Sequence, residues 1–185
     1  MRVIGGKLKS RKLKTLKGDQ TRPTADKIKG AIFSSIAFDT NYNAMLDLFA
    51  GSGAMGIEAL SRGFKYVHFN DLSRDAIKII KANLSDLNLT SLSKVSNLDY
   101  KKCLKSLSEK NQFDFIFIDP PYGMVDIGEI FADINKYDSV SKSGLVVVEV
   151  SSQTDLKDHY YDLYKYKEKK YGSTTVFYYK KEGRK

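Results

Sequence analysis

From residue 44 to residue 150, short apolar runs alternate with segments of helical length, and this alternation constrains the fold more than any other feature. The runs at 113–118 and 144–150 are apolar at nearly every position, as strands covered on both faces are. The pattern predicts an α/β fold with a mostly parallel sheet between two layers of helices. The expected strands are 44–49, 66–70, 92–96, 113–118 and 144–150, then a hairpin of 160–169 and 174–179; the expected helices are 54–63, 73–88, 100–110 and 125–139.

The first 23 residues form a separate unit in this interpretation. Hydrophobic residues alternate with basic ones there, and turn signals divide the segment, which predicts two short strands at 2–8 and 11–16 with a basic face. Thr24 is a good N-cap, so a helix is expected over 25–38. We therefore expect a basic β-hairpin arm at 1–23 and a single α/β domain at 24–185.

Charge is distributed unevenly along the chain. The 31 basic and 22 acidic residues give a net charge of +9. Residues 1–30 carry +8, residues 31–150 carry −3, and residues 151–185 carry +4. A basic arm on a nearly neutral body is typical of a protein that binds nucleic acid, although it also fits binding to a membrane surface or a solubilising terminus.

Several classes of protein are not expected from this composition. Cys103 is the single cysteine, so an intramolecular disulfide is excluded and a reducing compartment is favoured. The sequence shows neither the apolar core of a signal peptide nor a run of about 20 apolar residues. His68 and His159 are isolated from other metal ligands. We therefore expect a soluble, cytoplasmic monomer with no membrane partner and no metal.

A glycine-rich turn follows the first expected strand. Gly51, Gly53 and Gly56 form G-x-G-x-x-G between a strand and a helix, the context in which this pattern binds a ligand. Glycine lets the backbone turn sharply and approach the ligand closely. Asp71 ends the second expected strand, 20 residues after Gly51, where its carboxylate can accept from two ribose hydroxyls. A dinucleotide and S-adenosylmethionine both fit this layout.

Two features favour S-adenosylmethionine. Asp47 lies directly before the turn, where it can pair with the ammonium group of a methionine moiety but would repel a pyrophosphate. The fourth strand runs into Asp119-Pro120-Pro121-Tyr122. The two prolines remove backbone donors and stiffen the chain, which leaves nearby carbonyl oxygens available to a ligand.

The residue types at 119–122 suit methyl transfer to an exocyclic amino group. The lone pair of such an amine is delocalised into the ring, so the nitrogen is a poor nucleophile. Asp119 and the Pro120 carbonyl can accept the amine hydrogens, orient the nitrogen and stabilise its developing positive charge. Tyr122 offers a ring on which a flipped-out base can stack. The predicted catalytic residues are Asp119, Pro120, Pro121 and Tyr122.

The chain resembles a specific family of methyltransferases along nearly its whole length, about 1–179. The opening MRVIGGKLKSRKL, TRPT at 21–24, LDLFAGSG at 46–53, the segment around 119–122 and YGST at 171–174 are similar to the bacterial 16S rRNA (guanine(966)-N2)-methyltransferase family. The sequence departs from the family pattern at Ser10, Asp71 and Ser173.

The resemblance implies a Rossmann-like class I methyltransferase fold with seven strands, the last antiparallel, and an RNA-binding hairpin extension. It implies methyl transfer from S-adenosylmethionine to guanine N2 in 16S rRNA of the small ribosomal subunit. It makes Asp99 a candidate for the adenine amino group, and a helix N-cap is the alternative there. The expected cofactor-binding residues are Asp47, Phe49, Ala50, Gly51, Ser52, Gly53, Gly56, Asp71, Leu72, Asp99 and Tyr100; the expected RNA-binding residues are Arg2, Lys7, Lys9, Arg11, Lys12 and Arg22.

Other functions fit the sequence less well. A DNA adenine-N6 methyltransferase uses the same chemistry but normally needs a target-recognition insertion, and no segment is free to supply one. An NAD-dependent oxidoreductase needs a substrate domain, and a non-catalytic assembly factor would not need an intact 119–122 segment. Glu149 ends the fifth strand, where a structural and a functional role are equally compatible with the sequence. Asn83 and Met55 are interpreted as packing or solvent-facing residues.

Overall fold

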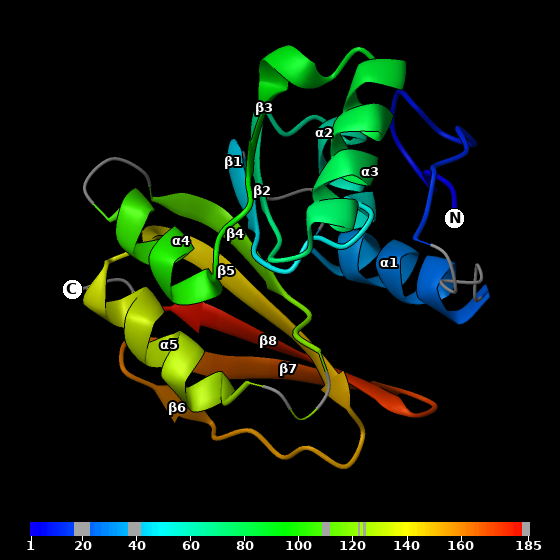
Figure 1. Cartoon of the computed structure of the whole chain (residues 1–185). Helices are drawn as coiled ribbons and strands as arrows, with labels where there is room; N and C mark the ends of the chain where they lie inside the picture. The colour runs from blue at the N-terminus through cyan, green and yellow to red at the C-terminus, as the bar shows by residue number, and fades with distance from the viewer. Residues whose placement is uncertain (17–22, 37–41, 109–111, 122, 124, 183–185) are drawn as a thin grey trace.

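The computed structural model of the chain describes residues 1–16, 23–36, 42–108, 112–121, 123 and 125–182. One mixed sheet runs through it, with the strand order β3-β2-β1-β4-β5-β8-β7-β6 (Figure 1). The helices are α1 (Pro23–Ser35), α2 (Ala54–Ser61), α3 (Arg74–Asp86), α4 (Tyr100–Leu107) and α5 (Ile127–Lys136). The strands are β1 (Ala44–Asp47), β2 (Tyr66–Asn70), β3 (Ser93–Ser96), β4 (Phe113–Ile118), β5 (Val140–Ser151), β6 (His159–Tyr160), β7 (Leu163–Tyr171) and β8 (Thr174–Lys181).

The predicted parallel core is confirmed. β1 to β5 are mutually parallel, and β8 pairs antiparallel with β5. The expected count of seven strands is wrong by one, because the segment predicted as 160–169 is divided. Tyr161 adopts a positive φ of 58° between β6 and β7, and a residue in that conformation cannot continue a strand.

Helices cover both faces of the sheet (Figure 1). Phe115, Phe117 and Val147 pack on the face that α1, α2 and α3 cover, which we call the α1–α3 face. Ile116 and Val148 pack on the opposite face under α4 and α5, which we call the α4–α5 face. The central strands are therefore buried on both sides, which is why their sequences are continuously apolar.

The N-terminal arm folds back on itself as predicted, but over a shorter length. Its pairing consists of an antiparallel bridge between Arg2 and Lys12, and the Val3 N–H donates to the Arg11 carbonyl at 2.9 Å. The two strands expected at 2–8 and 11–16 are thus reduced to one bridge. The chain turns through residues 5–10 instead, and the helix that follows begins at Pro23, so Thr24 lies inside α1 and is not its N-cap.

None of the helices in these ranges combines the length and apolarity that crossing a bilayer requires. Within the same residues, no group of three or more metal-ligating side chains converges.

Candidate active site

The candidate site lies at the carboxyl ends of β1 and β4, which are neighbours in the sheet. The strand order reverses there, since β2 and β3 lie on one side of β1 while β4 and β5 lie on the other. Ligands of open α/β sheets bind in the crevice at such a reversal. The glycine turn follows β1 and the 119–122 segment follows β4, so the sheet brings together the two motifs that the sequence indicated.

The three glycines have separate roles. Gly51 and Gly53 have positive φ values of 53° and 78°, which side-chain-bearing residues rarely adopt. A Cβ added at Gly51 would meet nothing within 4 Å, so this part of the turn faces open space. Gly56 is required for packing, because a Cβ there would lie 2.2 Å from the Phe69 ring.

Asp47 is buried, with 1% of its surface exposed. Its Oδ2 accepts a hydrogen bond from the Gly56 N–H at 3.0 Å. Burial raises the pKa of Asp47 to about 7, and the neighbouring charges of Asp119 and Asp71 add to the shift. A carboxyl group in this position favours a cationic ligand, as expected for the ammonium group of a methionine moiety.

Asp71 is tied directly to the glycine turn. Its Oδ2 accepts from the Gly51 N–H and its Oδ1 from the Ser73 N–H, both at 2.8 Å. Each carboxylate oxygen retains a second lone pair for a ligand. The next residue, Leu72, is 71% exposed beside this acid. The predicted ribose acid therefore borders the same turn as the predicted ammonium acid.

Two further carboxyl groups lie at the same level of the sheet: Asp119 directly after β4, and Glu149 near the end of β5. The register pairs Ile118 with Val148, so Asp119 and Glu149 come next on adjacent parallel strands and share a face. Burial and the charge of Asp119 raise the pKa of Glu149 to about 8. Pro120 is buried and Pro121 is exposed, whereas Tyr122 lies outside the described residues. Asp119 thus has acidic neighbours on both sides, Asp47 and Glu149.

Asp99 and Tyr100 begin α4. Asp99 caps this helix, because its Oδ1 accepts from the Lys101 N–H at 2.9 Å, which confirms the N-cap interpretation. Its contact with adenine stays a prediction. Tyr100 is buried against the Phe49 ring, with 5.8 Å between the ring centroids. Both predicted residues therefore have clear local roles in the fold.

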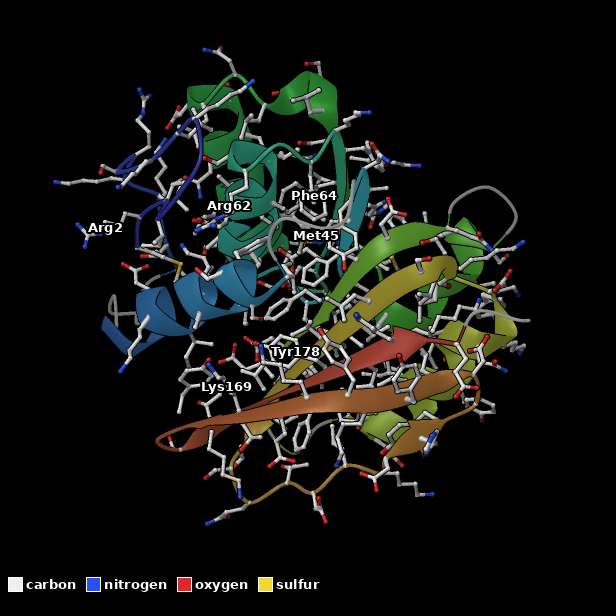
Figure 2. The ribbon with its side chains drawn as sticks, turned by 180° about the vertical axis from the view of Figure 1, so that it is seen from behind. Arg2, Met45, Arg62, Phe64, Lys169 and Tyr178 are labelled. Atoms are coloured by element: carbon white, nitrogen blue, oxygen red, sulfur yellow. The ribbon has the colours of Figure 1, made fainter. Side chains whose placement is uncertain are left out.

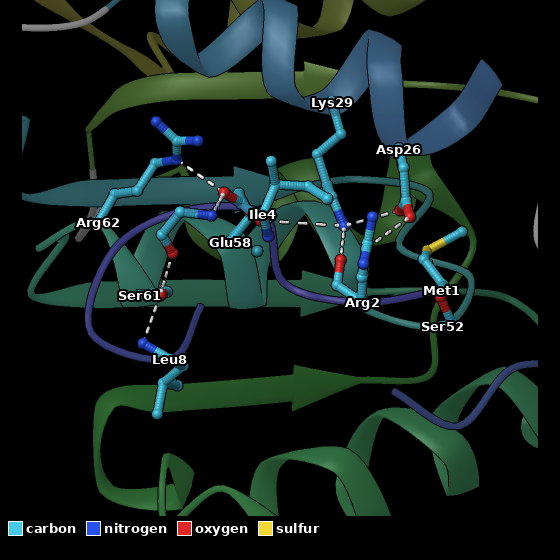
Figure 3. A network of polar contacts seen from close by, with 12 residues as sticks. Met1, Arg2, Ile4, Leu8, Asp26, Lys29, Ser52, Glu58, Ser61 and Arg62 are labelled. Carbon is cyan, nitrogen blue, oxygen red and sulfur yellow. Dashed lines mark hydrogen bonds and ion pairs between the residues drawn. The ribbon is translucent and has the colours of Figure 1, made fainter. Parts of the chain in front are cut away.

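Ala50 and Ser52 complete the turn. The Ala50 N–H donates to the Asn70 carbonyl at 2.9 Å, which attaches the turn to the end of β2. The Ser52 hydroxyl donates to the Met1 sulfur at 3.8 Å, so the beginning of the arm reaches the glycine turn (Figure 3).

The arm presents its basic side chains outward. Arg2, Lys7, Lys9, Arg11 and Lys12 are all exposed. Arg2 lies 3.8 Å from an oxygen of Asp26, and this is the one ion pair found for these five within the described ranges. Arg22 lies outside the described residues.

The residues that fasten the arm to the body were not expected from the sequence. Glu58 of α2 is fully buried, and its carboxylate accepts from the Ile4 and Gly5 N–H groups at 2.7 and 2.8 Å (Figure 3). It also pairs with Arg62 at 2.7 Å. Lys29 of α1 donates to the Arg2 carbonyl at 2.6 Å. The sequence does contain one indication of this role: Glu58 lies on the apolar side of a short helix, where a buried acid needs polar partners.

Asn83, interpreted from the sequence as a packing or solvent-facing residue, is a packing residue with a further role. This α3 residue is buried, with 2% exposed, and it bridges the arm and the glycine turn. Its amide exchanges two hydrogen bonds with the Lys14 backbone, at 2.9 and 3.0 Å, and donates to the Ser52 carbonyl at 3.0 Å. No local pattern predicts this role, because Lys14, the partner of Asn83, lies 69 residues away in the sequence.

Residues 1–180 match the family model described as Conserved hypothetical protein 95. The chain belongs to this family. It is 40% identical over 184 residues to "Putative rRNA methyltransferase YlbH" of Bacillus subtilis (strain 168), covering 99% of this chain and all of that protein. It is 37% identical over 123 residues to "Ribosomal RNA small subunit methyltransferase D" of Haemophilus influenzae, covering 66% of this chain and 64% of that one.

Solved structures agree with the predicted class of fold. "Putative methyltransferase yhhF from Escherichia coli" superposes with a TM-score of 0.85 at 26% identity, over 100% of this chain and 99% of that one. A methylase of Haemophilus influenzae superposes with a TM-score of 0.82 at 27% identity, over 98% of each chain. This member of the Conserved hypothetical protein 95 family therefore has the class I S-adenosylmethionine-dependent methyltransferase fold.

Proposed function

We propose that this chain transfers a methyl group from S-adenosylmethionine to the exocyclic N2 of a guanine in 16S rRNA. The proposal includes action as a monomer in the cytoplasm, on the small ribosomal subunit or its rRNA. The relatives named above are described as rRNA methyltransferases. The position of the guanine follows from the family resemblance noted for the sequence.

One observation carries the proposal: Asp119 follows β4 beside the end of β1, where buried Asp47 and the glycine turn lie. Asp47 holds a ligand ammonium group, Asp71 holds the ribose hydroxyls, and Asp119 faces the substrate amine. A donor held between the first two would direct its methyl group toward the third. The sheet therefore supports donor binding and amine activation at one edge.

The bound donor supplies an activated methyl group on a sulfonium. Asp119 and the Pro120 carbonyl accept hydrogens of the guanine amine and align its nitrogen for in-line attack. A new N–C bond forms as the S–C bond breaks, and the bonding electron pair stays on sulfur. The charge that develops on nitrogen is stabilised by Asp119, and one amine proton is lost.

The arm supplies much of the affinity for RNA. Lys7, Lys9, Arg11 and Lys12 lie outside the catalytic edge, are exposed, and have no ion-pair partner in the described ranges. Contacts of such side chains to phosphates increase affinity without reading much sequence. We propose that residues 1–23 act as an RNA-binding arm and residues 24–185 as the catalytic domain.

Replacing Asp119 tests the proposal. We expect Asp119→Ala to bind S-adenosylmethionine within about threefold of the wild-type affinity while methyl transfer falls by at least about 100-fold, since the amine loses its acceptor. The assay is transfer of a tritiated methyl group to small subunits from cells that lack this protein, followed by nucleoside mapping. Asp158→Ala, which removes an exposed acid paired with Lys165, is the matched control. Label on adenine or on DNA would contradict the proposed substrate.

A further inference from the structure

The outer part of the sheet carries charge that the arm and the catalytic edge do not explain. β7 contains four lysines, Lys165, Lys167, Lys169 and Lys170, and a single acid, Glu168. One edge of β7 pairs with β8 along the strand. The other edge pairs with β6 only at Leu163 and Tyr164, so within the described residues no strand covers that edge over 165–171.

The two faces of β7 differ in charge. Lys167 and Lys169 are paired with Tyr178 and Val176 of β8, which lie on the α1–α3 face. Glu168 is paired with Phe177, which lies on the α4–α5 face. The acids near β7 belong to that second face, where Lys165 pairs with Asp158 at 2.9 Å and with Glu168 at 3.9 Å.

Five residues make up the basic face of these strands, which we call the β7 surface: Tyr166, Lys167, Lys169 and Tyr171 of β7 with Lys180 of β8. Within the described part of the chain, its three lysines form no ion pair, and neither strand places an acid on this face. Burial lowers the pKa of Lys167, and the charge of Lys169 on the same face adds to the shift.

Aromatic rings accompany the lysines. The Lys167 ammonium lies 5.0 Å from the Tyr178 ring centroid, and the Lys180 ammonium lies 4.7 Å from that of Tyr166. Tyr166 is 37% exposed, so part of its ring is open to solvent. Lysines interleaved with tyrosine rings are the combination that binds single-stranded nucleic acid, through phosphate contacts and base stacking.

The β7 surface ends at the catalytic edge. Tyr171 pairs with Thr174, and Thr174 pairs with Ser151 at the end of β5. Ser151 follows Glu149 by two residues, so the strand leads from Lys167 and Lys169 toward the candidate site. Figure 2 shows Lys169 and Arg2 on opposite sides of α1.

We propose that the β7 surface is a second RNA-binding surface, which contacts the substrate strand on the side of the catalytic edge away from the arm. The inference rests on the proposed function, because the polyanion it binds is that RNA. The lysines contact phosphates and the Tyr166 ring is available to an unpaired base. Lysines also protect exposed sheet edges from pairing, but edge protection does not explain why Glu168, the one acid of β7, lies on the other face.

The test compares two triple variants with the same loss of charge. The first is Lys167→Gln, Lys169→Gln and Lys180→Gln. The control is Lys105→Gln, Lys136→Gln and Lys142→Gln, which are exposed residues of α4, α5 and β5 without ion pairs in the described ranges. Each full-length protein is titrated, in the presence of S-adenosylhomocysteine, with 16S rRNA transcribed in vitro over a range of potassium chloride concentrations.

We expect the β7 variant to bind the rRNA about tenfold more weakly than the wild type, and the control within about twofold. The slope of log K against log salt should fall in magnitude by about 2 in the β7 variant, since each lost phosphate contact removes about 0.7–0.9. Affinity for S-adenosylhomocysteine should be the same in all three proteins, which verifies folding.

Equal affinity and equal slope in the two triple variants would overturn the inference while leaving the proposed function intact. If the wild type neither bound nor methylated the rRNA, the proposed function would fail and the inference with it. Tyr166→Ser separates stacking from charge: it should weaken rRNA binding about tenfold with no change in slope, whereas Tyr166→Phe should bind as the wild type does. A wild-type affinity in Tyr166→Ser would remove the stacking contact from the proposal.

Discussion

At the scale of single residues, the molecule concentrates carboxyl groups at one sheet edge. Asp47 ends β1, Asp119 follows β4 and Glu149 lies near the end of β5, which are three neighbouring parallel strands. Burial raises the pKa of Asp47 and of Glu149, and the charge of Asp119 adds to both shifts. Clustered acids with raised pKa values destabilise a fold unless a ligand compensates them, which is why they mark functional sites. Asp47 and Glu149 therefore each have an expected pH dependence.

Glu149 should make the folded protein less stable as the pH rises. The folded state keeps the Glu149 proton up to about pH 8, whereas the unfolded chain loses it near the ordinary glutamate pKa. The free energy of unfolding therefore falls between those two pH values. Glu149→Gln should raise the melting temperature by a few degrees at pH 8 and by little at pH 5. An equal change in melting temperature at both pH values, measured by thermal unfolding, would show that Glu149 is not the source of this pH dependence.

Asp47 should make donor binding depend on pH. The ammonium group of the donor pairs with ionised Asp47, and burial raises the pKa of this acid to about 7. Affinity for S-adenosylmethionine should therefore rise by up to about tenfold per pH unit below 7 and level off above it. Titration calorimetry at pH 6, 7 and 8 measures this, together with the released proton. Asp47→Asn should bind about 10–100-fold more weakly with a flat pH profile; a pH-dependent Asn variant would exclude Asp47 as the source.

At the scale of elements, the arm is part of the fold and not an appended tail. Val3 and Leu13 are buried in the same core as α1, α2 and α3. Gly6 approaches α2 so closely that a Cβ there would lie 1.9 Å from the Ser61 carbonyl. Through Asn83, the arm is also joined to the glycine turn.

Removing the Asn83 amide should loosen both segments at once. Asn83→Leu preserves size but leaves the Lys14 and Ser52 backbone groups unpaired, which costs about 2–4 kcal/mol of stability. We expect faster tryptic cleavage within the arm and weaker binding of S-adenosylmethionine, measured by mass spectrometry and calorimetry. Asn135→Leu, on an exposed position of α5, should change neither. Faster cleavage with unchanged cofactor affinity would show that the arm and the turn are not coupled.

At the scale of the whole molecule, positive charge lies on two separate surfaces, and a cluster of carboxyl groups lies between them. The arm and the β7 surface are basic, while the catalytic edge gathers Asp47, Asp119 and Glu149. An RNA held by its phosphates on both basic surfaces would have its bases, and not its backbone, at the acidic edge. This arrangement suits chemistry on a flipped base.

Neutralising the arm should affect RNA binding and leave donor binding unchanged. Lys9→Gln, Arg11→Gln and Lys12→Gln together should weaken 16S rRNA binding about tenfold at moderate salt and reduce the salt slope by about 2. Affinity for S-adenosylhomocysteine should stay within about twofold, because these side chains are exposed on the arm and are not among the residues expected to bind the donor. An equal loss of donor affinity would mean that the arm shapes the cofactor site and is not primarily an RNA contact.

The sequence alone determined the parallel core, the glycine turn and the positions of Asp47, Asp71 and Asp119. These features depend on local patterns: buried strands are continuously apolar, and motif residues follow strand ends at fixed spacings.

Only the tertiary structure decided how the arm is fastened and which acids meet. Glu58 holds Ile4 across 54 residues and Asn83 holds Lys14 across 69, and Glu149 reaches Asp119 through strand register. The charge separation on β7 likewise depends on a bulge between Lys165 and Lys167 and on the register with β8. Such contacts join segments far apart in the chain, so no local sequence pattern predicts them. They form only because the helices and strands pack against one another in this arrangement.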